Sequence, residues 1–208
     1  CKGLREMEES EAFNKVKIND LLALCAGSDR NEEGLRVTDG SRGVVYVTGE
    51  GENEVRHGVC MPSPCALGCS FDRELVREVG KAVGSIASDG GYNAVLSPDA
   101  GIVRSPLYGS MADRFGEDPY LNGTLAAEWI SGAQSEGVAA VLSRFAGGTQ
   151  SSGKFTCDSM IDRRALFDLY LKPFEMAVKQ SQPRAVSVGI NKINGLASCG
   201  KPVVLSDM

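Results

Sequence analysis

Eight polar residues stand where expected strands give way to loops, and their side chains are the ones that could support chemistry. Carboxylates, guanidinium groups and amides that gather at one end of a parallel sheet can bind the hydroxyl groups of a polyhydroxy ligand. Each of them alone could equally cap a loop or form a surface ion pair. The eight residues are Asp39, Asp99, Arg104, Asp113, Ser143, Arg144, Asn191 and Asn194.

The sequence lacks the residue patterns that catalytic triads, phosphate-binding loops and zinc sites need. The single histidine, His57, stands in a charged stretch with no evident partner, which argues against Ser-His-Asp or Cys-His catalysis. No glycine-rich loop follows a strand, so the sequence lacks the usual phosphate-binding element of nucleotide-binding proteins. Cys60, Cys65 and Cys69 do not have the spacing of paired C-x2-C zinc ligands; we expect small buried thiols, with one disulfide as an option. Residues 122–124 match the N-glycosylation sequon, which carries little weight alone.

Composition bounds the class of protein. The 208 residues are 42% hydrophobic and 24% charged, which is ordinary for a globular domain. A net charge of −5 supplies no basic surface for nucleic acid or an anionic membrane, and we expect neither partner. No apolar run approaches the ~20 residues of a membrane span. The chain is shorter than the ~250 residues typical of a complete (β/α)8 barrel.

The polar residues must be positioned by alternating strands and helices, and this alternation predicts a single α/β domain. Asp72 and Asp118 are expected to cap two of the helices, and Pro173 should kink the third or mark a junction in it. Strands are expected at 35–40, 93–98, 138–142 and 184–190, and helices at 12–26, 72–88, 118–137 and from 162 to about 178.

A series of segments, in order along the chain, resembles the N-terminal barrel domain of glycoside hydrolase family 3, the β-glucosidase-type enzymes. The resemblance implies an incomplete, TIM-type (β/α)8 barrel over residues 34–208 that lacks its last β/α units, preceded by a helical lead-in over residues 1–33. The segments are GLRVTDGSRGV (34–44), CMPSPCALGCSFDRELVREVGKAVG (60–84), LSPDAGIVRSPLYG (96–109), FGEDPYLNGTLAAEWISGAQSEGVAAVL (115–142), DRRALFDLYLKPFEMAVK (162–179) and INKINGLASC (190–199).

The resemblance also implies a reaction, namely retaining hydrolysis of β-linked sugars by a carboxylate nucleophile and a separate acid/base, with no cofactor and no metal. Asp39 matches the family's sugar-binding aspartate in its T-D-G turn. Arg104 matches the family's R-S-P block, and Asn191 remains from its Y-N-x-x-N-G block. The expected substrate-binding residues are therefore Asp39, Arg104 and Asn191, and the expected ligand is a β-glucoside.

Several family residues that grip the sugar are absent. Ser110 stands where the family has an arginine, and Ser143 and Arg144 stand where it has the Lys-His of K-H-F. Val45 stands where the family's D-G-P-x-G-V-R turn has its final arginine, and Ile190 stands where the Y-N-x-x-N-G block has its tyrosine. Each lost donor leaves a ligand hydroxyl unpaired at about 1–3 kcal/mol. The pattern predicts a fold that has been kept after its sugar chemistry was lost.

The nucleophile is expected beyond Met208, so no catalytic residue is assigned within the chain. Ser206-Asp207 resembles the family's S-D-x nucleophile motif, but Cys199 lies eight residues earlier, the spacing at which the family begins a helix with L-L-T-D. An alternative alignment with a deletion makes Asp207 the candidate nucleophile.

Three hypotheses follow. The first is a degenerate, non-catalytic structural or binding component of a larger assembly, in which a protein partner or a continuation of the chain covers the open barrel edge. The second is the N-terminal part of a β-glucosidase-type retaining glycoside hydrolase that further chain completes. The third is a sugar-binding module that uses Asp39 and Arg104.

Overall fold

The computed structural model describes residues 36–48 and 55–198. The chain divides into two compact units, Cys1–Val37 and Thr38–Met208. The lead-in helix expected at 12–26 and the candidate Asp207 lie outside the described residues. The boundary expected after residue 33 therefore stays a prediction, and the fold below is that of the second unit and its first strand.

Four strands form the main sheet, and they are the four that the sequence predicts. They are arranged in chain order, β1-β4-β5-β7, which is the arrangement of consecutive β/α units in a barrel wall. β4 and β5 are parallel, with Ala94 opposite Ala139, and β5 and β7 are parallel as well. Their bounds are Val37–Asp39 for β1, Ala94–Leu96 for β4, Ala139–Phe145 for β5 and Ala185–Val188 for β7.

β5 runs three residues further than the sequence predicts. The expected strand ended at residue 142, where the apolar run stops, but Ser143 and Arg144 continue it to Phe145. Parallel pairing with β7 extends to Phe145, which lies opposite Val188. The two polar residues therefore stand on a strand end held by the sheet, which fixes their backbone more firmly than a loop would.

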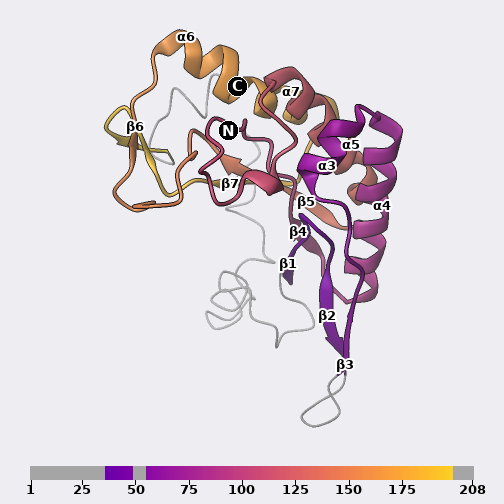
Figure 1. Cartoon of the computed structure of the whole chain (residues 1–208). Coiled ribbons are helices and arrows are strands. Elements are labelled where there is room, and N and C mark those ends of the chain that lie inside the picture. The colour runs from indigo at the N-terminus through magenta and orange to yellow at the C-terminus, as the bar shows by residue number, and fades with distance from the viewer. Residues whose placement is uncertain (1–35, 49–54, 199–208) are drawn as a thin grey trace, which may run out of the picture. The chain divides into compact units, whose positions relative to one another are not determined.

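Two long helices, α4 (Arg73–Asp89) and α5 (Pro119–Ser135), lie side by side and pack against the sheet (Figure 1). The predicted caps are confirmed: Asp72 accepts a hydrogen bond from the Leu75 N–H at 3.1 Å, and Asp118 accepts one from the Leu121 N–H at 2.6 Å. Such caps satisfy backbone donors that the first turn leaves free. Local sequence thus starts both helices.

Glycines let α4 and α5 approach closely. A methyl group on Gly80 would overlap the carbonyl oxygen of Trp129, and one on Gly132 would overlap that of Arg77. Each helix therefore lays its glycines against the backbone of the other. This contact fixes the helix pair as one layer over the strands.

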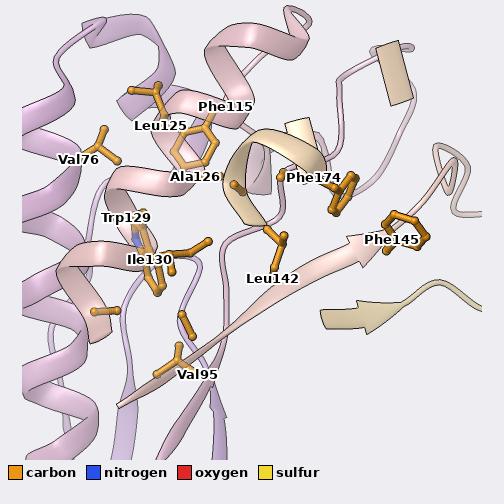
Figure 2. Close-up of a cluster of buried hydrophobic side chains, with 14 of the residues drawn as sticks. Val76, Val95, Phe115, Leu125, Ala126, Trp129, Ile130, Leu142, Phe145 and Phe174 are labelled. Atoms are coloured by element: carbon orange, nitrogen blue, oxygen red, sulfur yellow. The ribbon is translucent and has the colours of Figure 1, made fainter. Parts of the chain in front are cut away.

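The core lies between the helices and the sheet. Figure 2 shows Trp129 and Ile130 of α5 beside Val95 of β4 and Leu142 of β5, all of them at most 2% exposed. At the other end of β5, Phe145 meets Phe174 edge to face, with 5.2 Å between ring centroids. The core therefore reaches the carboxyl end of β5.

The third predicted helix is divided into three pieces. It begins near Asp162, as expected, and the Asp162 side chain caps it by accepting a hydrogen bond from the Ala165 N–H at 3.1 Å. The pieces are α6 (Arg163–Ala165), the π-helical segment η4 (Leu166–Leu171) and α7 (Lys172–Ser181). Pro173 lies in the first turn of α7, where its missing N–H costs least. The predicted junction at Pro173 is therefore confirmed.

Several short elements were not predicted. β2 and β3 form an antiparallel hairpin on which His57 stacks against Tyr46, with ring centroids 5.1 Å apart, and contacts the Thr48 hydroxyl at 2.7 Å. None of the helices in residues 36–48 and 55–198 is long and apolar enough to cross a bilayer. The short elements are β2 (Val45–Thr48), β3 (Val55–Gly58), α3 (Pro64–Ser70), η3 (Met111–Asp113), β6 (Asp158–Ser159), β8 (Lys192–Ile193) and β9 (Leu196–Ala197).

Candidate functional site

A polar cavity of about 450 Å³ lies at the carboxyl ends of the four main strands, and we call it the first cavity. Asp39 ends β1, Arg144 lies near the end of β5 and Ser187 lies in β7. Five of the eight residues singled out from the sequence are brought together here. The residues that line the cavity are Asp39, Ser41, Arg42, Gly43, Leu96, Asp99, Asp113, Ser143, Arg144 and Ser187.

Asp99 organises the wall of this cavity. Its side chain is 4% exposed, and its Oδ2 lies 3.3 Å from Nε of Arg114 and 3.5 Å from Nε of Arg144. Its Oδ1 accepts hydrogen bonds from the backbone N–H groups of Gly101 at 2.9 Å and Arg144 at 3.4 Å. A single buried carboxylate thus binds two guanidinium groups and holds Arg144 against the cavity through both its backbone and its side chain.

Arg114 is the residue that sequence reasoning missed. It is 1% exposed and donates to the carbonyl oxygens of Ile102 and Gly148, each at 2.8 Å, and to the Tyr108 hydroxyl at 3.3 Å. The guanidinium carbon also lies 4.4 Å from the centre of the Tyr108 ring, within cation–π range. Arg114 therefore joins the loop after β4 to the loop after β5. Arginine is mostly exposed in proteins, so this residue type by itself gives no signal of such burial.

Asp39 is exposed and lines the first cavity, and it forms no ion pair with another residue in 36–48 or 55–198. The turn behind it is tight, because a methyl group on Gly40 would overlap the Val95 side chain of β4. Asp113, by contrast, is paired with Arg42 at 3.4 Å. Of the three carboxylates around this cavity, Asp39 is the one best placed to accept hydrogen bonds from a ligand.

A second, smaller cavity of about 250 Å³ adjoins the first, because Arg144 and Ser187 line both. The residues around this second cavity are Tyr108, Arg144, Gly148, Gln150, Lys154, Cys157, Ser187, Val188, Gly189, Ile190 and Asn191. The two cavities together form a cleft along the ends of β5 and β7.

Comparison with known proteins identifies the family. Residues 43–208 match the family described as Glycosyl hydrolase family 3 N terminal domain. The chain belongs to glycoside hydrolase family 3.

Curated relatives in this family are β-glucosidases. Thermostable beta-glucosidase B of Acetivibrio thermocellus is 41% identical over 196 residues, which cover 88% of this chain and 26% of that enzyme. Beta-glucosidase B of Emericella nidulans is 33% identical, over 94% of this chain and 24% of that enzyme. The chain thus spans about a quarter of the length of the curated family 3 relatives that it matches.

Solved family 3 structures share the fold. Beta-glucosidase 3B from Thermotoga neapolitana, solved in complex with glucose, is 33% identical with a TM-score of 0.78, over 83% of this chain and 24% of that one. A Bifidobacterium adolescentis GH3 beta-glucosidase is 29% identical with a TM-score of 0.80, over 94% of this chain and 29% of that one. The predicted α/β, TIM-type barrel class is confirmed.

The remaining sequence candidates have different positions in this family 3 domain. Asn191 is 5% exposed and lines the second cavity, but its amide donates to the carbonyl oxygens of Ala146 at 3.1 Å and Lys192 at 3.2 Å. Asn194 binds the backbone of Ile161 through both ends of its amide, so it ties two loops together. Arg104 is exposed and lines neither cavity. Sugar binding by Arg104 and Asn191 stays a prediction.

Two lesser expectations are resolved. Asn122 of the sequon is fully buried in α5, and its amide donates to the carbonyl oxygens of Gly101 at 2.9 Å and Gly116 at 3.0 Å, so the folded chain offers no acceptor there. The four described cysteines, Cys60, Cys65, Cys69 and Cys157, are free thiols. Cys60 and Cys69 are exposed, so the expectation of buried thiols is wrong for these two, and Cys65 and Cys157 are only partly buried.

Proposed function

We propose that this chain binds β-glucosides in the first cavity and does not hydrolyse them by itself, so that it serves as a binding component of a larger assembly. The observation that supports this most directly is Asp39, a carboxylate at the end of β1 that lines a sugar-sized polar cavity and forms no ion pair within the described residues. Carboxylates of this kind accept hydrogen bonds from pairs of sugar hydroxyls.

The same cavity argues against hydrolysis by this chain alone. Retaining hydrolysis needs a free carboxylate nucleophile about 5 Å from a second carboxyl group. Asp99 is held between Arg114 and Arg144, and Asp113 is paired with Arg42. These carboxylates are engaged in ion pairs that shape the wall, which leaves Asp39 for binding.

Calorimetry with glucose and cellobiose tests the binding proposal. We expect saturable binding that Asp39→Ala weakens about tenfold or more, because the hydroxyls lose a charged acceptor. Asp89→Ala, which removes an exposed carboxylate at the end of α4, is the matched control and should bind like the unaltered chain. A flat titration of the unaltered chain would contradict the proposal.

A second candidate function is supported by the length of the relatives. We propose as the alternative that the chain is the N-terminal part of a β-glucosidase-type retaining glycoside hydrolase completed by further chain, since it spans about a quarter of enzymes up to 41% identical to it. Hydrolysis of p-nitrophenyl β-glucoside by the natural polypeptide, abolished by Asp39→Ala, would favour this alternative. The variant Asp207→Ala then distinguishes the two candidate positions of the nucleophile, Asp207 and a residue beyond Met208. If the variant remains active, Asp207 is not the nucleophile.

Either function leaves one edge of the sheet to be covered. β7 is the last strand of the described sheet, and Val186 on it is 38% exposed. Exposed apolar side chains beside an unpaired strand favour association. We expect a protein partner or further chain on this edge. A monodisperse monomer of this chain, seen by light scattering and with a closed, compact fold, would contradict that expectation.

A further inference from the structure

The two adjoining cavities differ in charge. Three carboxylates, Asp39, Asp99 and Asp113, line the first cavity together with Arg42 and Arg144. No carboxylate among the described residues lines the second, which instead contains Arg144 and Lys154. Lys154 is exposed, and the structure records no acidic partner for it among the residues described. The first cavity therefore has side chains of both charges, whereas every charged side chain that lines the second cavity is basic.

The charge at the basic end is not cancelled locally. Asp99 is shared by two guanidinium groups, Arg114 and Arg144, so these three side chains together carry one excess positive charge. Asp99 meets Arg144 at Nε, and the Arg144 side chain is 38% exposed where it lines both cavities. The outer nitrogens of that guanidinium are thus available to a ligand.

Arg114 adds to the positive charge near the second cavity from inside the protein. It is almost fully buried, and one of its terminal nitrogens donates both to the Gly148 carbonyl and to the Tyr108 hydroxyl, two groups on residues that line the second cavity. A charge in the interior is screened less by water and salt than one at the surface. Arg114, Arg144 and Lys154 together carry three positive charges against the one negative charge of Asp99, so the second cavity keeps an excess of positive charge.

We propose that the second cavity takes an anionic group, a carboxylate or a chemically similar oxyanion, carried by the unit beyond the glucosyl ring of a β-glucoside. The neutral ring lies against Asp39 in the first cavity, and the anion meets Arg144 and Lys154. This inference rests on the proposed binding function and adds a ligand class to it.

The test compares two disaccharides that differ at this unit. Cellobiose carries a neutral second sugar, whereas cellobionic acid carries gluconate in its place. Calorimetry with the full natural polypeptide should show cellobionate binding about threefold to tenfold more tightly than cellobiose at low salt. The ratio of the two affinities should shrink towards one as NaCl rises from about 0.05 M to about 0.5 M, because salt screens the partly exposed charges.

Variants at the exposed Lys154 identify the cavity. Lys154→Met should reduce the affinity ratio about threefold, and Lys154→Glu should reverse the preference, since it places a like charge beside the anion. Lys81→Met removes an exposed lysine on α4 and should leave the ratio as it is in the unaltered protein. None of these positions is buried, so all three variants should fold.

The possible outcomes of these experiments distinguish a failure of the inference from a failure of the proposed function. Cellobiose binding with no preference for cellobionate, or a preference that neither Lys154 variant changes, overturns the inference while the proposed binding function stands. Sodium gluconate that binds as tightly as cellobionate also overturns it, because the glucosyl ring then contributes nothing. If neither disaccharide binds, the proposed function fails and the inference fails with it.

Discussion

Two carboxylates in this chain each lie between two arginines, one on the outer helices and one at the cavities. Glu128 of α5 binds Arg73 and Arg77 of α4, with Arg77 Nε 2.8 Å from its Oε2. Asp99, after β4, binds Arg114 and Arg144. The two clusters have the same composition but different surroundings.

Solvent explains the difference. The side chains of Arg73 and Arg77 are 62% and 56% exposed, so water solvates both cations whether or not Glu128 is charged. Arg114 is 2% exposed, so the protein itself must balance its charge. The outer cluster therefore fastens one helix to another, whereas the inner one fixes the position and charge of groups that a ligand meets.

Breaking the inner cluster should have the largest effect. Asp99→Asn leaves Arg114 buried without its anion, and we expect the free energy of unfolding to fall by about 3–5 kcal/mol, measured by urea denaturation. Asp168→Asn is the control, because Asp168 forms an exposed pair with Arg164, and it should cost less than about 0.5 kcal/mol.

The double variant Asp99→Asn, Arg114→Met separates charge from packing. It removes the stranded cation together with its partner, so it should recover part of the stability that Asp99→Asn loses. A double variant no more stable than Asp99→Asn alone would show that the hydrogen bonds of Arg114 to Ile102 and Gly148, not the charge balance, hold this region.

The inner cluster is also where sequence reasoning stopped. Asp72 and Asp118 could be predicted as helix caps because a capping carboxylate and the backbone N–H that donates to it lie within three residues. The ion pair of Asp99 with Arg114 spans 15 residues, and the hydrogen bond from the Arg144 N–H to Asp99 spans 45. Contacts at such separations depend on the completed sheet, and no local pattern announces them.

The sequence accordingly predicted where the candidate site lies better than it predicted what each residue does there. Asp39, Ser143 and Arg144 were expected at strand ends and do line the first cavity. Arg104 was carried over from a motif and lines neither cavity, because a motif match fixes a residue's position in the chain but not the direction of a long side chain. The unpredicted Arg114 shows the converse, a residue without a motif that supports the whole wall.

Removing the outer carboxylate should have a smaller effect than removing the inner one. Glu128→Gln keeps the shape of the side chain and leaves Arg73 and Arg77 to solvent, so we expect the free energy of unfolding to fall by about 1–2 kcal/mol. Urea denaturation beside Asp99→Asn makes the comparison directly. Equal losses in the two variants would contradict the role given to solvent.

The outer cluster should also show a defined pH dependence. Burial of Glu128 would raise its pKa, but hydrogen bonds and charges from Arg73 and Arg77 outweigh it and hold the pKa below 4.5. A lowered pKa contributes stability that is full above the unfolded-state pKa and is lost as pH falls through the folded-state value. The gap in unfolding free energy between the unaltered chain and Glu128→Gln should therefore stay constant from about pH 7 to about pH 5.5 and narrow below about pH 4.5.

Urea denaturation of both proteins across this range measures the gap. Glu117→Gln, at an exposed carboxylate just before α5, supplies the control and should differ little from the unaltered chain at any pH. A gap that persists undiminished to about pH 3 would mean that the arginines stabilise the Glu128 side chain by packing rather than by its charge.

The smallest effects should come from removing one arginine of each pair. Arg77→Met leaves Glu128 bound to Arg73, and Arg144→Met leaves Asp99 bound to Arg114, so neither carboxylate is stranded. We expect both variants to lie within about 1 kcal/mol of the unaltered chain in unfolding free energy. Their effects on ligand binding should nevertheless differ, because Arg144 lines both cavities and Arg77 lines neither. A loss of cellobionate affinity in Arg144→Met without a loss of stability would separate the guanidinium that serves the ligand from the one that serves the fold.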